Sequence, residues 1–150
     1  MRLVCTGVVI FAAMLGGGCG AGSKTPTAGD PKALDQLKGT WRVTAIEAGG
    51  KSVATDRVQK IGLEYRFEGD KVTIHRPDRP DDTSTVSVDA TANPKKMTIN
   101  QSPPVQAVYS VDGNKLQLCI IVDENPKAGY PTELASKASP KTDLLTLERR

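Results

Sequence analysis

The feature that most restricts the fold of this chain is an alternation of apolar and polar residues that recurs from Trp41 to Leu147. The clearest run is 61–67, in which every second residue is apolar and Gly, Glu and Arg stand between. A period of two residues is the pattern of a β-strand with one buried face. Short turn signals such as Gly49-Gly50 and Gly69-Asp70 separate the runs. The chain is therefore predicted to fold into antiparallel hairpins.

About eight strands are expected in chain order, because no predicted helix is long enough for a parallel crossover. Their expected positions are 41–46, 61–67, 72–75, 83–90, 97–99, 105–111, 116–122 and 144–149. Residues 76–82 and 123–141 hold several Pro and charged residues, and they are predicted to be exposed connections. An open meander would expose two sheet edges, and closure removes them. We expect an all-β, antiparallel up-and-down barrel with room for side chains or one small ligand.

A short helical turn is expected just before the first strand. Asp30 is a suitable N-cap, Pro31 suits the first helical position, and Gly39 ends the turn. Its apolar face consists of Ala33, Leu34 and Leu37. A helical piece of this size can plug one end of a barrel.

The N-terminus has the pattern of an export signal in residues 1–18. Met1-Arg2 is positively charged, and the apolar run from Leu3 to Leu15 is too short for an ordinary membrane span of about 20 residues. Cys19 follows three Gly residues and resembles the lipobox cysteine of bacterial lipoproteins, although Gly16 stands where that pattern prefers Leu. We expect cleavage before Cys19 and its acylation. The alternative is cleavage nearby, for example after Ala21, which releases a secreted protein.

Residues 19–31 are expected to form a flexible tether, and residues 32–150 the folded domain, because only the latter show apolar periodicity. Cys5 would leave with the signal and Cys19 would carry lipid, so Cys119 would be the only free thiol. No disulfide is then possible. The expected location is the cell envelope, on the periplasmic face of a membrane that the acyl chains anchor stably.

Charge and composition argue against nucleic acid as a partner. The net charge is +3, aromatic residues make up 4% of the chain, and no basic stripe with interleaved aromatic residues is present. A mixed-charge, solvated surface is the simpler interpretation.

No residue pattern predicts catalysis, a cofactor or a metal site. His75 is the only His, and it lies beside Arg76 on the polar face of its strand. No second His or nearby general base accompanies it, so a solvated side chain is expected. Cys119 is expected to be partly buried and inert. Asp78, Asp81 and Asp82 lack the spacing of a calcium loop and have Arg neighbours. The Gly run at 16–18 is no phosphate loop, because no strand precedes it.

Three segments together resemble a known family. The first is Leu37-Lys38-Gly39-Thr40-Trp41-Arg42-Val43, with Ile46-Glu47 and the turn at Gly49-Gly50-Lys51. The second is Tyr109-Ser110-Val111-Asp112-Gly113-Asn114-Lys115-Leu116-Gln117-Leu118-Cys119. The third is Tyr130-Pro131-Thr132-Glu133-Leu134-Ala135-Ser136-Lys137, running on to Leu145-Thr146-Leu147-Glu148-Arg149. Over about residues 33–149 the chain resembles the lipocalin-like domain family of uncharacterised function that is expanded in planctomycete bacteria. Where that family often has Arg-Pro and Phe, this chain has Tyr130-Pro131 and Leu134.

The resemblance implies a calycin-type barrel whose closed end holds Trp41. It also implies that Arg149 packs over the Trp41 ring as a structural cap, a cation–π contact of about 0.5–2 kcal/mol. The expected function is that of a non-enzymatic envelope protein that binds a small apolar ligand at the barrel mouth, with ligand-binding residues unassigned. The alternative is a protein–protein interaction module with a packed core and no ligand.

Overall fold

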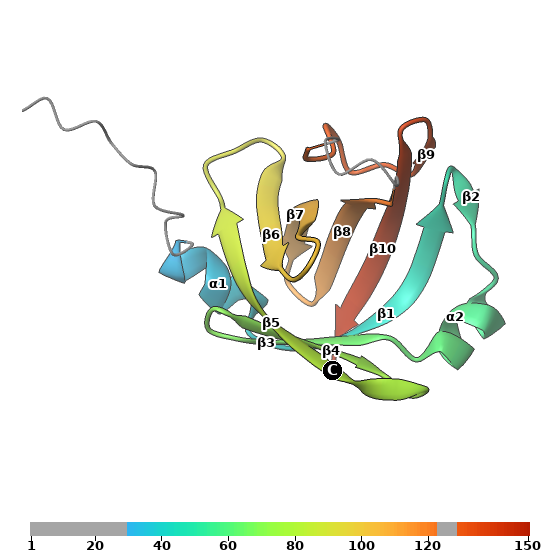
Figure 1. Ribbon diagram of the computed structural model, residues 1–150, viewed down its shortest axis with the longest axis horizontal. Helices are drawn as coiled ribbons and strands as arrows, with labels where there is room; N and C mark the ends of the chain where they lie inside the picture. The colour runs from blue at the N-terminus through green and yellow to red at the C-terminus, as the bar shows by residue number, and fades with distance from the viewer. Residues whose placement is uncertain (1–29, 123–128) are drawn as a thin grey trace, which may run out of the picture.

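The computed structural model describes residues 30–122 and 129–150. Within them one sheet holds the strands in the order β2-β1-β3-β4-β5-β6-β7-β8-β10-β9, and β1 also pairs with β10. The sheet therefore closes on itself as an eight-stranded antiparallel barrel in up-and-down order, with two short extra strands at its edge (Figure 1). The elements are α1 (Pro31–Leu37), β1 (Gly39–Ala48), β2 (Lys51–Ser52), α2 (Thr55–Ile61), β3 (Glu64–Glu68), β4 (Lys71–Arg76), β5 (Arg79–Asp89), β6 (Lys95–Asn100), β7 (Val105–Asp112), β8 (Lys115–Ile121), β9 (Lys137–Ala138) and β10 (Lys141–Arg149). The predicted fold class is confirmed.

Helix α1 begins where the sequence predicts. The Asp30 carboxylate accepts a hydrogen bond from the Lys32 backbone N–H at 3.0 Å, and Pro31 is the first helical residue. Residue 31 thus belongs to the helix and not to the expected tether. The apolar face of α1 is buried in the barrel core. In Figure 1, α1 and α2 lie on opposite sides of the barrel. Neither is long and apolar enough to cross a membrane, and the same holds for every helical stretch described.

A β-bulge changes the expected face of half of β1. Val43 pairs with Leu147 and Ala45 pairs with Thr146, so Thr44 is the extra residue. Strict alternation from Trp41, as the sequence pattern predicts, would place Ala45 inward and Ile46 outward. Instead Ala45 is exposed and Ile46 packs against the core, because one inserted residue moves every later side chain to the other face.

Two predicted boundaries are wrong near the second and fourth long strands. Ile61 ends α2 and is 39% exposed; it does not begin a strand. Gly62 follows in the left-handed conformation with φ of 56°, which ends the helix, and β3 starts at Glu64. The expected loop 76–82 is only the turn at Pro77-Asp78, because residues from Arg79 onward pair with β4 through their backbone. Their charged side chains point to solvent, which a sheet with a wet outer face accommodates.

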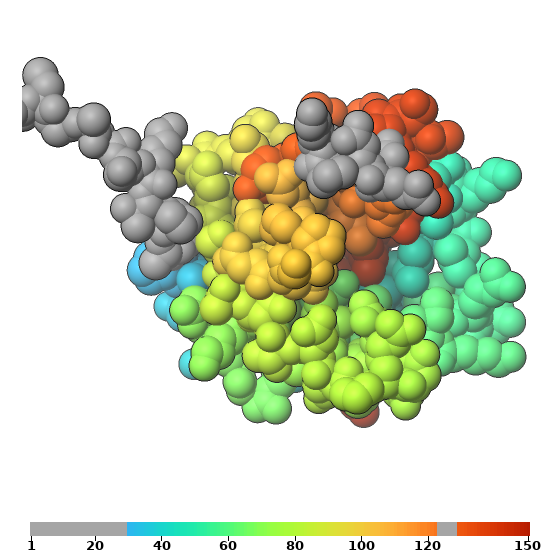
Figure 2. Space-filling model, viewed as in Figure 1, coloured from blue at the N-terminus to red at the C-terminus, as the bar shows by residue number. Residues whose placement is uncertain are grey.

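The last strand divides its three Leu residues between two apolar clusters. Leu145 and Leu147 face the barrel interior, whereas Leu144 packs outside with Val108 and Cys119. Tyr130 and Leu134 cover this outer cluster. They belong to residues 129–138, which we call the strap and whose orange-red atoms line the upper edge of the molecule in Figure 2.

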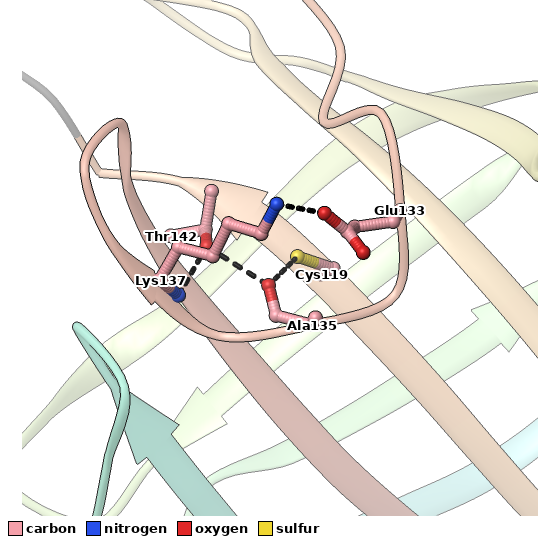
Figure 3. Close-up of polar contacts among 5 residues, drawn as sticks. All are labelled: Cys119, Glu133, Ala135, Lys137 and Thr142. Atoms are coloured by element: carbon pink, nitrogen blue, oxygen red, sulfur yellow. Dashed lines mark hydrogen bonds and ion pairs between the residues drawn. The ribbon is translucent and has the colours of Figure 1, made fainter.

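Polar contacts hold the strap against β8 and β10 (Figure 3). The Thr142 hydroxyl donates to the Ala135 carbonyl at 2.9 Å and accepts from the Lys137 backbone N–H at 2.8 Å. Lys137 also forms an ion pair with Glu133. The strap is therefore a fixed outer layer over part of the sheet, within a segment that the sequence predicts to be an irregular connection.

Candidate functional site

The closed end of the barrel is built around Trp41. Its side chain is fully buried, and its indole N–H donates to the Leu37 carbonyl at 2.6 Å. The Arg149 guanidinium carbon lies 4.5 Å from the centre of the Trp41 ring, and its Nη2 donates to the Gln36 carbonyl at 2.8 Å. The two residues that the resemblance pairs as a cap thus lie in cation–π contact. Together they join α1 to the first and last strands.

Large side chains fill the interior next to this end. Phe67, Met97, Leu116 and Leu147 are each at most 1% exposed and belong to one core cluster with Trp41. Close packing of this kind gives well-defined side-chain positions and high local stability.

One polar group is buried in this packed half. The Tyr109 side chain is 1% exposed, and its hydroxyl has no hydrogen-bond partner among the described residues. Burial raises the pKa of Tyr109 to about 12, and the carboxylates of Asp30 and Asp89 act in the same direction. The phenol is therefore neutral at physiological pH.

The opposite end, which we call the mouth, is less completely covered. Its inner face is formed by the partly buried Ile46, Ala48, Val105 and Ile120 together with Asp143. Helix α2 also lies at this end and buries Val58 in the same core. The apolar side chains of the mouth thus continue the core toward solvent.

Asp143 is the unusual residue of the mouth. Register places it directly opposite Ile120 on one side and Ala48 on the other, and it shares the inward face of β10 with Leu145 and Leu147. Its Oδ1 atom is buried and has no hydrogen-bond partner among the described residues. A buried carboxylate oxygen without a donor costs free energy, so Asp143 is the polar group best placed to receive a donor from a ligand. The sequence does not single out Asp143, because Leu144, Leu145 and Leu147 leave the inward face of this strand ambiguous.

Arg76 carries a positive charge near the buried Tyr65 side chain. Burial raises the pKa of Tyr65, and the charge of Arg76 partly opposes that rise. Arg76 ends β4 on the same side of the barrel as α2.

The only His lies on the outer surface in a groove of about 460 Å³ across β1, β3, β4 and β5. Its Nδ1 atom is 2.5 Å from the Asp81 carboxylate, and both side chains are half-exposed. The sequence offered no such neighbour for His75, since Asp81 reaches it only through the pairing of β4 with β5. Among the described residues, Asp81 is the only hydrogen-bond partner of the His75 side chain, and no second group of the groove is held against the imidazole.

The other sequence candidates lie apart from one another. Asp78 occupies the β4–β5 turn, 3.9 Å from Arg79, whereas Asp81 pairs with His75. Asp82 pairs with Ile74 through the backbone. In residues 30–122 and 129–150, no three His, Cys, Asp or Glu side chains are grouped as metal ligands would be.

Cys119 is more deeply buried than predicted. It is 0% exposed beneath the strap, and its thiol donates to the Ala135 carbonyl at 3.4 Å (Figure 3). Burial raises the pKa of the thiol, which keeps it protonated and unreactive. The expectation of a partly buried side chain is wrong because the strap covers this outer face of the sheet.

The predicted export signal 1–18, with its Gly run at 16–18, and the lipid-attachment candidate Cys19 lie outside the described residues. A comparison with protein-family models, with curated proteins and with solved structures found no match. The resemblance to the planctomycete lipocalin-like family therefore depends on the three sequence segments, and family membership stays a prediction.

Proposed function

We propose that this chain is a non-enzymatic, lipocalin-like binding protein that takes a small, largely apolar ligand at the mouth of its barrel. The observation that carries the proposal is the contrast between the large side chains of the closed half, which are at most 1% exposed, and the partly buried aliphatic side chains of the mouth. Binding sites of this kind are concave and mostly apolar, with few polar groups that fix orientation.

The mouth also suggests the polarity of the ligand. The apolar body would cover Ile46, Val105 and Ile120, gaining about 25 cal/mol for each Å² of apolar surface removed from water. A donor at one end, such as an ammonium, amide or hydroxyl group, would pair with the unpartnered Oδ1 of Asp143. A carboxylate head group would be repelled there.

Displacement of a fluorescent apolar probe tests the proposal. Two competitors of equal chain length, a long-chain alkylamine and a fatty acid, should differ in affinity by roughly tenfold in favour of the amine, because only the amine can donate to Asp143. The Asp143→Leu variant should lose this preference and still bind the probe. Equal affinities in the unmodified protein would show that Asp143 does not contact the ligand.

A matched pair of variants locates the binding site. Ile120→Trp places a bulky ring in the mouth, and Ile121→Trp places the same ring on the outer face of the same strand. Only the first should abolish probe binding, while both should keep the circular dichroism of the folded barrel. Equal binding by the two variants would place the probe elsewhere.

The alternative function is an interaction module whose loops contact a protein partner. The near-zero exposure of the large side chains in the closed half favours it, because that half has its interior filled by the chain itself. Failure of every apolar probe to bind, at protein and probe concentrations that detect weak complexes, would favour this alternative.

The proposed setting is the cell envelope. The apolar run and Cys19 support export and acylation, with anchoring to a membrane by two or more acyl chains. Cys19→Ala should abolish incorporation of labelled fatty acid and release the protein from the membrane fraction. If the unmodified chain takes up no acyl group, it is secreted instead.

A further inference from the structure

A second concave site lies outside the barrel, between α2 and the β4–β5 turn. This cleft has a volume of about 410 Å³ and is lined mainly by Arg57, Lys60, Ile61, Arg76, Pro77 and Arg79. Arg57, Lys60 and Ile61 fall at spacings of three and four residues, so they share one face of α2 while Val58 points to the core. Helix and hairpin thus present their cations to the same space.

Close packing holds the two sides of the cleft together. A Cβ atom placed on Gly62 would lie 2.8 Å from Cγ of Pro77, so the end of α2 and the hairpin tip are in direct contact at this point. Gly62 also has a φ of 56°, which a residue with a side chain rarely adopts. The approach of the hairpin to the helix is therefore a built feature of the fold.

The charge of the cleft is strongly unbalanced. Four cations line it, and Asp78 is the one carboxylate beside them. Asp78 lies 3.9 Å from Arg79, and in the described part of the chain Arg57, Lys60 and Arg76 form no ion pair. A concave site that gathers one sign of charge raises the local concentration of the opposite ion.

The hairpin adds a specific reason for an anion. Arg76 and Arg79 are direct cross-strand partners, and like charges in this position destabilise a hairpin. An oxyanion between the two guanidinium groups would turn this repulsion into two charge-assisted hydrogen bonds.

We propose that this cleft binds a phosphate group. A phosphate offers several acceptor oxygens and up to two negative charges, which match two Arg forks and a Lys better than a single carboxylate does. Ile61 is the one large apolar side chain exposed in the described residues, and with Pro77 it provides a surface for carbon atoms attached to the phosphate. The phosphate can belong to a free anion or to a phospholipid head group. This site is independent of the mouth.

The test uses two double variants of the full chain with equal charge. Arg57→Gln with Lys60→Gln removes two cations from the cleft, while Lys38→Gln with Lys115→Gln removes two exposed cations elsewhere. Calorimetric titration with inorganic phosphate and with glycerol 3-phosphate measures the free anion. Cosedimentation with phosphatidylglycerol vesicles, compared with phosphatidylcholine vesicles, measures the lipid source.

The cleft variant should bind at least roughly tenfold more weakly than the unmodified protein, and the control variant should bind like it. Saturable binding of a free phosphate with this pattern assigns the site to soluble anions. Binding only to the anionic vesicles, with the same pattern, assigns it to the head group. No binding in either assay, or equal loss in both double variants, overturns the proposal. Binding of the apolar probe at the mouth should be unchanged in the cleft variant. The proposal for the cleft and the proposal for the mouth can therefore be refuted separately.

Discussion

The two ends of this barrel solve the same packing problem in different ways. At the closed end, α1 contributes three apolar side chains to the core. The Trp41 indole N–H donates a hydrogen bond to that helix, and the Arg149 guanidinium lies over the Trp41 ring. At the mouth, partly buried aliphatic side chains surround a carboxylate oxygen that has no partner among the described residues. We therefore expect stability to be concentrated at the closed end, so that the mouth can retain a carboxylate that is unfavourable on its own.

The largest expected effect comes from comparing two large-to-small substitutions in β8, one at each end of the barrel. Leu116 and Ile120 both face inward from β8, but Leu116 is 0% exposed at the closed end and Ile120 is only partly buried at the mouth. Leu116→Ala should lower the free energy of unfolding by about 2–5 kcal/mol, and Ile120→Ala by less than half as much. Urea unfolding followed by Trp41 fluorescence measures both. Equal losses would mean that the mouth is packed as tightly as the closed end.

A smaller effect is expected from the cap. Arg149→Gln removes the cation above Trp41 and the hydrogen bond to Gln36, and should cost about 0.5–2 kcal/mol of unfolding free energy. The adjacent Arg150→Gln is the control, because its ion pair with Glu64 lies at the surface and should contribute about 0–1 kcal/mol. The emission of Trp41, the single Trp, should shift only in the first variant. Indistinguishable stabilities would remove the energetic role of the cap.

The smallest effect concerns the buried hydroxyl in the packed half. Tyr109→Phe deletes an unpartnered group, so the unfolding free energy should stay the same or rise by up to about 1 kcal/mol. Tyr130→Phe is the opposite control, because it breaks the 2.5 Å hydrogen bond to Thr98 and should cost about 0.5–1.5 kcal/mol. A clear loss in Tyr109→Phe would show that its hydroxyl has a partner in solution.

The dependence of stability on alkaline pH tests the raised pKa of Tyr109. Its pKa is about 12 in the folded protein and about 10 when unfolded, so the folded state holds more protons between these values. The stability contribution is complete below pH 10 and is lost as pH rises toward 12. Tyr65, whose pKa burial also raises, acts in the same direction. Between these two pH values, the unfolding free energy should therefore decline less steeply in Tyr109→Phe than in the unmodified protein.

Sequence patterns predicted the strands best where alternation is unbroken. The run from Val105 to Val111 and the turn at Asp112-Gly113-Asn114 agree with β7 and its connection to β8. The prediction failed at Thr44, where the bulge is set by pairing with β10, a strand about a hundred residues away. It failed again at Ile61, whose apolar side chain fits a strand pattern but completes the last turn of α2. Local periodicity does not contain either of these long-range choices.

The site was less accessible to sequence reasoning than the fold. Asp143 is a candidate contact because it lies between Ile120 and Ala48 in the barrel. The cationic cleft depends on the contact of Gly62 with Pro77. The sequence predicts a partly buried Cys119 thiol, whereas the strap covers it completely. Each of these features joins segments that are distant in the chain.

By itself, the sequence determined the fold class of this protein, because a period of two residues with short polar turns indicates an antiparallel sheet. Eight such strands in chain order favour closure into a barrel, which is the observed arrangement. Only the tertiary structure decided which carboxylate faces the interior, which cations share a cleft and which thiol is covered. Alternation gives each strand two faces, but the register between strands decides which face is inside.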